Sequence, residues 1–406
     1  MGREATDRQV RRRRVFYIPG YDPFPPRRYR ELYRREGAKQ AEISGYRLEN
    51  APRSAEGGFG WGVRAEIDGQ HTETDVTVLV WADLVKGSMA RGVWATYLLL
   101  ARTFWIYLST GAMGRLFRLR RGPVITAMYP VAVLLGQLAL GLGAAWGVAR
   151  VAGIWLPAWL SVPLGLAVVW PLLAWFRRID GRLYAHYLLH DYAFTAQFYG
   201  RTPPALEARL TEFAGEMAAA LASDVDEVLV VGHSSGAHLG VEALAEVIRA
   251  GHVREGGPAL AFLTLGQAIP MQSFLPQATR LRADLHLLAG SDALTWVDVS
   301  APGDGCCYAL CDPVAVSGAA PQVKRWPLVI SAAFSKTLAP ETWKKLRRRF
   351  FRLHFQYLCA FDGPSEYDYF RITAGPVTLA ARYAGRRPSA SRKETVLSPH
   401  TARAAA

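Results

Sequence analysis

The sequence predicts an α/β fold, a mainly parallel sheet into which a helical hairpin that crosses a membrane is inserted. Three observations predict it. Apolar strands alternate with helical segments along most of the chain, as in a parallel sheet covered by helices. At 227–250 a strand runs straight into a glycine-rich turn and a helix. The charge-free runs 122–149 and 151–176 each exceed the ~20 apolar residues with which a helix spans a bilayer.

Five segments follow from this pattern. A basic lead (1–14) and a tail rich in Ser, Arg and Ala (386–406) enclose the rest, and the composition of the tail predicts disorder. The hairpin (122–176) separates an N-terminal part of the sheet domain (15–121) from a C-terminal part (177–385).

Short strands and one polar helix are expected before the hairpin. They are a strand at 15–18, a loop at Pro19-Gly20-Tyr21-Asp22-Pro23, a helix at about 27–42, and strands at 60–67 and 74–81 joined by a turn at Asp68-Gly69. Residues 93–108 are apolar but contain Arg102. They predict an amphipathic helix at the membrane surface rather than a span.

Aromatic and small residues support the two predicted spans. Tryptophans lie near the expected membrane interfaces: Trp146, Trp155, Trp159, Trp170 and Trp175. Glycines that permit close helix packing recur in both runs: Gly136, Gly141, Gly143, Gly147 and Gly165. The connection around Gly153 is short, so the two helices form a hairpin.

Arginines flank both outer ends of the hairpin, whereas the connection carries only Arg150. They are Arg115, Arg118, Arg120 and Arg121 before the first helix, and Arg177, Arg178 and Arg182 after the second. The positive-inside rule therefore puts the sheet domain in the cytoplasm. Because the early apolar run 15–18 is too short for a signal peptide, we expect a multi-pass protein of a bacterial inner membrane.

Alternating helices and strands resume after the hairpin. They are a helix at 205–222, a strand at 227–232, a helix at 237–250, strands at 259–265, 294–299 and 326–332, and a basic helix at about 340–358. The basic helix carries Lys344, Lys345, Arg347, Arg348, Arg349 and Arg352. It is either a solvated face or a surface that attracts an anionic leaflet.

The net charge limits the classes of molecule that the protein is expected to bind. The formal net charge is +14, which indicates an acidic partner. A nucleic-acid binder would mix aromatic and basic residues on a sheet face, and the basic residues here lie in helices and tails instead. We therefore expect a lipid bilayer as the partner and no nucleic acid.

The cysteines predict neither a metal site nor disulfides. Cys306, Cys307, Cys311 and Cys359 lack the paired Cys-x-x-Cys spacing or nearby histidines of a metal site. In a cytoplasmic domain they are expected to be reduced thiols near the core. Because phosphate-binding and dinucleotide-binding motifs are also missing from the sequence, we expect no metal and no cofactor.

The most informative stretch is Gly232-His233-Ser234-Ser235-Gly236. Strand, Gly-x-Ser-x-Gly and helix together predict a nucleophile elbow. The chain turns sharply there, so small residues are needed on both sides of Ser234. The turn raises the Ser234 hydroxyl above the sheet edge, and the N-terminus of the next helix points at the same place. The adjacent His233 and His238 are expected to pack or bond locally rather than bind metal.

These residues resemble the α/β-hydrolase superfamily. The resemblance covers about 15–120 and 180–380. It depends on the elbow, on Gly20-Tyr21-Asp22 and on Leu263-Thr264-Leu265-Gly266-Gln267. It implies an α/β-hydrolase-like sheet and a triad in the order Ser, Asp or Glu, His. The hairpin inserted before the elbow strand departs from the pattern of the superfamily.

That order selects the base. His252, His286, His354 and His400 follow the elbow helix or end it. His252 ends the helix, His286 precedes the expected acid, and His400 lies in the tail. The resemblance therefore implies that His354 is the base, although a surface histidine beside a basic cluster would have the same sequence.

The superfamily places the acid in a loop after a late strand, which selects Asp304, since it follows the strand at 294–299 among small residues. Asp298 and Asp312 remain alternative acids. The oxyanion needs two backbone donors, and the N–H groups of Ser235 and Tyr21 are the candidates. An ordinary Pro-Gly turn is the other interpretation of the loop that contains Tyr21.

The sequence therefore predicts a membrane-anchored serine hydrolase (a lipase-like esterase) that cleaves a lipid or other long-chain acyl ester. Anchoring would raise the effective concentration of a water-insoluble substrate at the site. Two alternatives remain. An acyltransferase would use the same triad with an alcohol in place of water, and a silent protein would keep the fold only for binding.

Overall fold

The computed structural model describes residues 9–54, 57–89 and 92–405, so the first eight residues of the basic lead lie outside the description. Within these ranges, eight strands form one sheet in the order β2-β3-β4-β1-β5-β6-β7-β8. Their bounds are β1 Arg12–Ile18, β2 Arg47–Ala51, β3 Gly60–Ile67, β4 Gln70–Val78, β5 Glu227–His233, β6 Ala259–Leu265, β7 Thr295–Ser300 and β8 Leu328–Ser331. The α/β class expected from the sequence is confirmed.

The sheet is mostly parallel, as predicted. All pairs from β4 to β8 run parallel, and only β2 and β3 are antiparallel to their neighbours. Strand β1 lies between β4 and β5, where Tyr17 pairs with both Val78 and Val231. The carboxyl ends of β1 and β5 are therefore adjacent. In an open parallel sheet this edge is where ligands bind.

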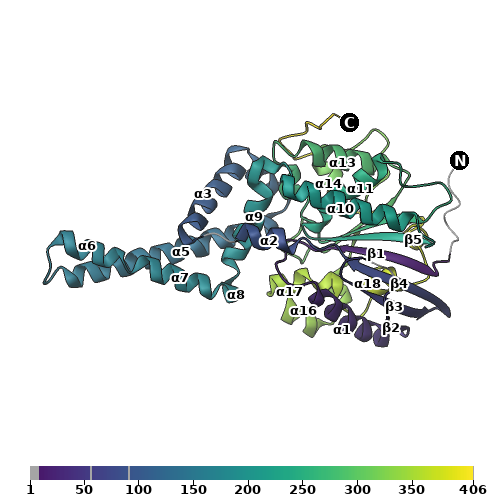
Figure 1. Cartoon of the computed structure of the whole chain (residues 1–406), viewed down its shortest axis with the longest axis horizontal. Helices are drawn as coiled ribbons and strands as arrows, with labels where there is room; N and C mark the ends of the chain where they lie inside the picture. Colours follow the sequence, from purple (N-terminus) through teal and green to yellow (C-terminus); the bar gives the residue numbers. More distant parts are fainter. Residues whose placement is uncertain (1–8, 55–56, 90–91, 406) are drawn as a thin grey trace.

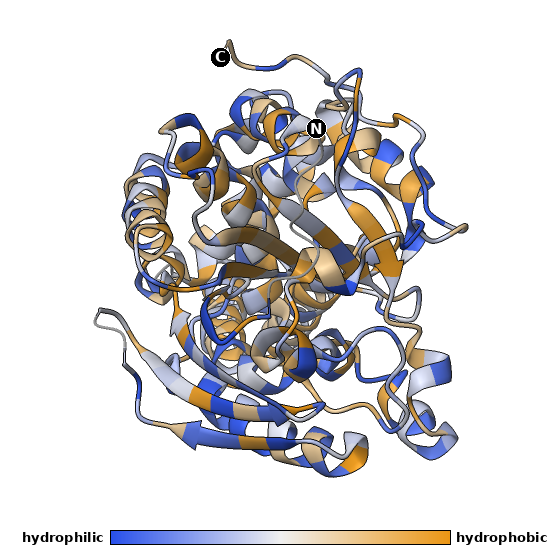
Figure 2. Ribbon diagram, turned by 90° about the vertical axis from the view of Figure 1, so that its right-hand side faces the viewer, coloured by the Kyte–Doolittle hydropathy of each residue, from blue (hydrophilic) through white to orange (hydrophobic). Residues whose placement is uncertain are grey.

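Helices cover both faces of the sheet (Figure 1). Helices α10 (Pro204–Leu221), α11 (Gly236–Arg249) and α13 (Thr279–Gly290) pack on the face that carries Phe16 and Val230. Helices α1 (Arg27–Ser44) and α18 (Tyr369–Ala374) pack on the face of Tyr17 and Val231. Neighbouring strand residues thus pack in hydrophobic cores on opposite faces of the sheet. The central strands are hydrophobic along much of their length (Figure 2).

The remaining helices are shorter or belong to the projecting part of the chain. They are α2 Ala82–Met89, α3 Val93–Ser109, α4 Ala112–Leu119, α5 Arg121–Ala152, α6 Ala158–Leu166, α7 Val169–Arg178, α8 Asp180–Leu183, α9 Ala185–Ala196, η1 Gln197–Gly200, α12 Pro270–Ser273, α14 Pro313–Val316, α15 Phe334–Thr337, α16 Pro340–Leu346, α17 Phe350–His354, η2 Gln356–Leu358 and α19 Leu379–Arg382.

A helical hairpin projects from the sheet domain (Figure 1). In the described part of the chain, two segments are long and apolar enough to cross a membrane by length and composition, Arg121–Ala152 and Ala158–Arg178. The turn between them lies near Gly153, as expected, but the second segment is interrupted between α6 and α7. Pro171, near the start of α7, has no N–H to donate to the carbonyl of Ala167, and its ring crowds that carbonyl, which interrupts the helix there.

One of the five predicted glycines, Gly165, is required for close helix packing. A Cβ on Gly165 would lie 2.3 Å from the carbonyl oxygen of Ala145, so α6 approaches the backbone of α5 directly. A Cβ on Gly141 would lie 3.4 Å from Val169, which is an ordinary van der Waals contact. The other three glycines (Gly136, Gly143 and Gly147) have open space at the Cβ position. Helix α3 differs from the predicted amphipathic helix, because it buries Leu100 while its exposed side carries the apolar Leu98 and Trp105.

The predicted basic helix at 340–358 is not continuous. It divides into α16, α17 and η2, because Arg349 leaves helical geometry with φ −108° and ψ 71°. The break reorients the chain so that Leu353 and His354 are buried while the neighbouring Arg352 stays exposed.

The tail also differs from the prediction of disorder. Described residues 386–405 lie along the body, and Lys393 N–H donates to Leu310 O over 2.7 Å. Arg282 is fully buried, and its Nε donates to Ala402 O over 2.7 Å. A composition rich in Ser, Arg and Ala cannot indicate that a buried guanidinium elsewhere needs the carbonyl groups of the tail.

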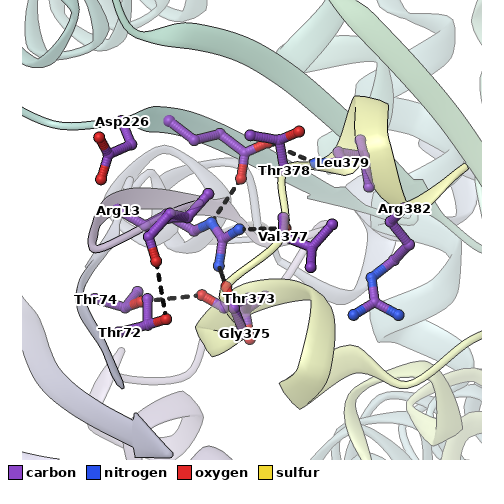
Figure 3. Close-up of polar contacts among 12 residues, drawn as sticks. Arg13, Thr72, Thr74, Asp226, Thr373, Gly375, Val377, Thr378, Leu379 and Arg382 are labelled. Carbon is purple, nitrogen blue, oxygen red and sulfur yellow. Dashed lines mark hydrogen bonds and ion pairs between the residues drawn. The ribbon is translucent and has the colours of Figure 1, made fainter. Parts of the chain in front are cut away.

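A buried ion pair ties the start of β5 to the C-terminal segment (Figure 3). Arg13 Nε lies 2.6 Å from Glu227 Oε2, and neither side chain is more than 1% exposed. The other guanidinium nitrogens donate to Gly375 O (2.7 Å) and Val377 O (2.8 Å). The second carboxylate oxygen accepts from Leu379 N–H over 2.7 Å. Arg13, predicted to belong to the basic lead, is therefore part of the core.

Candidate active site

Ser234 occupies a strained turn between β5 and α11. Its φ of +57° lies in the left-handed region, which is rare for a residue other than glycine. Its N–H donates to Leu265 O over 2.9 Å, which fixes the turn against β6. A Cβ on Gly232 would lie 2.7 Å from Gly236 O, and one on Gly236 would lie 2.1 Å from Ile18 O. The spacing of the motif is therefore imposed by close backbone approach, and strain of this kind recurs at active sites.

Asp304 and His354 form a buried pair beyond the carboxyl end of β7. Asp304 Oδ2 lies 2.7 Å from His354 Nδ1 and also accepts from the Tyr357 hydroxyl over 3.1 Å. The Cys306 N–H donates to Oδ1 over 2.9 Å. Burial alone would raise the pKa of Asp304, but the charge and hydrogen bond of His354 and the hydrogen bond from the Cys306 N–H hold that pKa below its ordinary value. The carboxylate therefore stays ionised and orients the imidazole.

The other side of His354 faces the same cavity as Ser234. The cavity encloses about 60 Å³, and its lining includes Ser234, His354 and Gly20. His354 Nε2 is buried and has no hydrogen-bond partner within the described ranges. Catalytic hydrogen bonds are often long before substrate binds, so a Ser–His pair remains compatible with this arrangement.

Both predicted oxyanion donors lie beside Ser234. Ser235 follows it and precedes the first residue of α11, Gly236. Tyr21 follows Gly20, whose Cβ would lie 3.0 Å from the Cβ of Ser234, so the loop after β1 rests against the serine. Tyr21 is buried, and its carbonyl accepts from the Tyr187 hydroxyl. The loop is therefore held in place by its own packing and by α9.

The alternative acids make other contacts. Asp298 is buried on β7 and accepts from the Thr264 hydroxyl over 2.6 Å, and burial raises its pKa to about 7. Asp312 caps α14 and pairs with Lys324. Of the three carboxylates considered from the sequence, Asp304 is the one hydrogen-bonded to His354.

The other histidines also lie elsewhere. His286 contacts Ala319 O, His400 contacts Thr110 O, and His252 is exposed beyond α11. His233 stacks on His354 with ring centroids 4.8 Å apart, and its Nε2 lies 2.9 Å from His354 O. Burial and the neighbouring His354 lower the pKa of His233 to about 3. His233 is thus neutral and positions the candidate base, and His238 is a buried residue of α11 whose pKa burial lowers to about 4.

Sequence reasoning missed two members of the site. Tyr357 bonds Asp304, and Asp191 of α9 lines the cavity with one oxygen 3.5 Å from Ser235 Oγ. Burial raises the pKa of Asp191 to about 7. A single acid in the mostly apolar helix α9 was the available signal, but no spacing connects that helix to the elbow.

Among the described residues, one cluster of side chains could hold a metal ion. The ligand atoms of Asp304, Cys306 and His354 lie within 4.8 Å of one another. The Asp304 oxygens are already bound by His354, Tyr357 and a backbone N–H. Burial raises the pKa of the Cys306 thiol, which disfavours the thiolate that binds zinc. The donor set thus fits an Asp–His pair better than a metal centre.

Comparison with known proteins gives no relative. No family model, curated protein sequence or solved structure matches the chain.

Proposed function

We propose that the chain is a membrane-anchored serine hydrolase of the α/β-hydrolase type that cleaves acyl esters. The observation that carries the proposal is the open Asp304–His354 pair, because its unpartnered Nε2 and the strained Ser234 line one cavity. The elbow after a central parallel strand, an acid after a late strand and a base further along the chain support assignment to that superfamily.

Each group has a defined step. His354 Nε2 accepts the proton of Ser234 as its oxygen attacks the acyl carbon, while Asp304 stabilises the resulting imidazolium. The N–H groups of Ser235 and Tyr21 stabilise the oxyanion. His354 then gives the proton to the leaving alcohol. Water, activated by the same imidazole, cleaves the acyl-enzyme and restores the serine.

The position of the hairpin supports a membrane-bound substrate. Pro123, in the first turn of α5, lines the cavity of Ser234. The Thr126 hydroxyl donates over 2.9 Å to the carbonyl of Gly305, the residue after Asp304. The candidate site thus lies where the first apolar segment begins. With arginines at this end of the hairpin, the proposed location is the cytoplasmic face of a bacterial inner membrane.

Hydrolysis of fatty-acyl esters by the purified full chain tests the proposal. Ser234→Ala should lower the rate by a factor on the order of 10⁴–10⁶ while the variant remains folded and membrane-bound. A wild-type protein that cleaves no ester would point to a silent binding protein, and transfer to an added alcohol in preference to water would point to an acyltransferase.

A further inference from the structure

Resting on the proposed function, we propose that the substrate is an anionic phospholipid. Its acyl chain enters an apolar cavity against α5, and its phosphate-bearing head binds Lys345, Arg349 and Arg352 in a groove on the other side of the catalytic cavity. The three spaces are neighbours that share lining residues, so an ester at Ser234 would lie between the chain and the head.

The groove meets the catalytic cavity at a wall common to both. Asp22, Tyr187, Phe351 and Phe355 line the groove and also the cavity of Ser234. The groove has a volume of about 1140 Å³ and lies between α1 and the α16–α17 segment. It is therefore much larger than the catalytic cavity and has room for a polar head group.

The charges of the groove favour an anion. Its acidic residues already have partners. Asp22 lies 3.6 Å from Arg28, Glu31 lies 3.1 Å from Arg34, Glu36 lies 2.9 Å from Arg35, and Asp180 accepts from the N–H groups of His186 and Tyr187.

Three cations of the groove have no such partner. Lys345, Arg349 and Arg352 are exposed, and none forms an ion pair among the described residues. Arginine and lysine bind phosphate through charge-assisted hydrogen bonds. These three side chains therefore complement a phosphate that lies in the groove.

The apolar cavity meets the catalytic cavity on the opposite side. Tyr192 and Met271 line both spaces. From there the apolar cavity extends past Ala127 and Val131 of α5 and Leu100 of α3. Its lining contains no charged residue, and α5 is the first of the two apolar segments. The apolar cavity has a volume of about 50 Å³, so it would hold only the part of an acyl chain near the ester, while the rest of the chain would lie along α5 in the bilayer.

The head-group assignment is tested with a matched pair of triple variants on the full chain in mixed vesicles. Lys345→Gln, Arg349→Gln and Arg352→Gln remove the groove cations. Lys344→Gln, Arg347→Gln and Arg348→Gln remove the same charge from the same segment outside the groove. Rates are measured on phosphatidylglycerol and on phosphatidylcholine with identical chains. We expect the ratio of the two rates to fall about tenfold in the first variant only, because ordered contacts to phosphate are lost. Equal losses in both variants would mean general attraction to the membrane and would overturn the head-group site.

The acyl-chain site is tested with a second pair of variants. Ala127→Trp fills the apolar cavity, whereas Ala139→Trp lies on an exposed part of the same helix. The first should lower the rate ratio of long-chain to short-chain esters by about tenfold, and the second should leave it unchanged. No change in either variant would overturn the chain site.

A lipid-binding experiment distinguishes a failure of this inference from a failure of the proposed function. Phosphatidylglycerol and phosphatidylcholine bound to the Ser234→Ala variant are counted by native mass spectrometry. A preference for phosphatidylglycerol that disappears with the groove cations supports the site even if no ester is cleaved. Activity on esters without a preference for phosphatidylglycerol would overturn the lipid assignment and leave the hydrolase proposal standing. The same conclusion would follow if the variant without the groove cations lost activity selectively on a soluble acyl nucleotide thioester.

Discussion

The two ends of β5 each lie beside a buried charged pair, and the pairs differ in one respect. At the first residue, Glu227 and Arg13 have hydrogen-bond partners on both carboxylate oxygens and on each guanidinium nitrogen (Figure 3). Beyond the last residue, Asp304 and His354 leave Nε2 without a partner in the described structure. A closed pair stabilises the fold, whereas a pair that keeps one atom free beside a nucleophile can do chemistry.

The largest effect is expected from variants that break the Asp304–His354 pair. Asp304→Asn should lower kcat by a factor on the order of 10⁴, because the imidazole loses the carboxylate that fixes its tautomer and stabilises its charge. His354→Gln should cost a similar factor, and the double variant little more, since the two residues act as a unit. Asp298→Asn is the control. A severe loss in Asp298→Asn with near-normal Asp304→Asn would move the acid to Asp298.

The second prediction breaks the closed pair. Arg13→Met leaves Glu227 buried without its cation and should destabilise the fold by about 3–5 kcal/mol. Arg12→Met, which removes an exposed ion pair with Asp224, should cost about 0–1 kcal/mol. Denaturant unfolding of the sheet domain in detergent compares them. If both variants lose the same small stability, the Arg13 network is not structural.

The third prediction concerns how closely the site is packed. Gly266 has φ +53°, and a Cβ there would lie 2.6 Å from the Tyr357 ring and 3.2 Å from His354 Cε1. Gly266→Ala should therefore displace the imidazole and lower kcat by up to about 100-fold. Gly251→Ala imposes a similar backbone strain in open space and should leave kcat unchanged. Equal kcat values in the two variants would contradict the packing of the candidate base.

The smallest effect is a pH dependence at Asp191. Burial raises its pKa to about 7, whereas the unfolded value is about 3.9. Between these values the native state binds a proton that the unfolded state lacks, so this group lowers stability as pH rises towards 7. Asp191→Asn should gain melting temperature relative to wild type as pH increases from about 5 to about 8. A difference that does not change with pH would contradict the raised pKa.

Much of the fold was predictable from local pattern. The elbow strand, its helix and the strand at 259–265 occur within one residue of the expected bounds. Strand β2 was missed because its sequence, Arg-Leu-Glu-Asn-Ala, is polar and mostly exposed at the sheet edge. The order of the tail depends on the distant Arg282, which no local pattern connects to it.

The candidate site was predictable in part for the same reason. Ser234 is identified by a motif that the backbone itself requires, so sequence suffices. Asp304 and His354 were chosen by chain order, and their 2.7 Å hydrogen bond depends on tertiary structure. Asp191 and Tyr357 reach the site from segments whose sequences carry no catalytic pattern.

Mapping the adduct of a fluorophosphonate ester tests the central claim most directly. Peptide mass spectrometry of the labelled full chain should find the phosphonyl group on Ser234, with labelling abolished in Ser234→Ala and strongly slowed in His354→Gln because the base is missing. A label on another residue, or labelling of Ser234→Ala at the wild-type rate, would contradict the account.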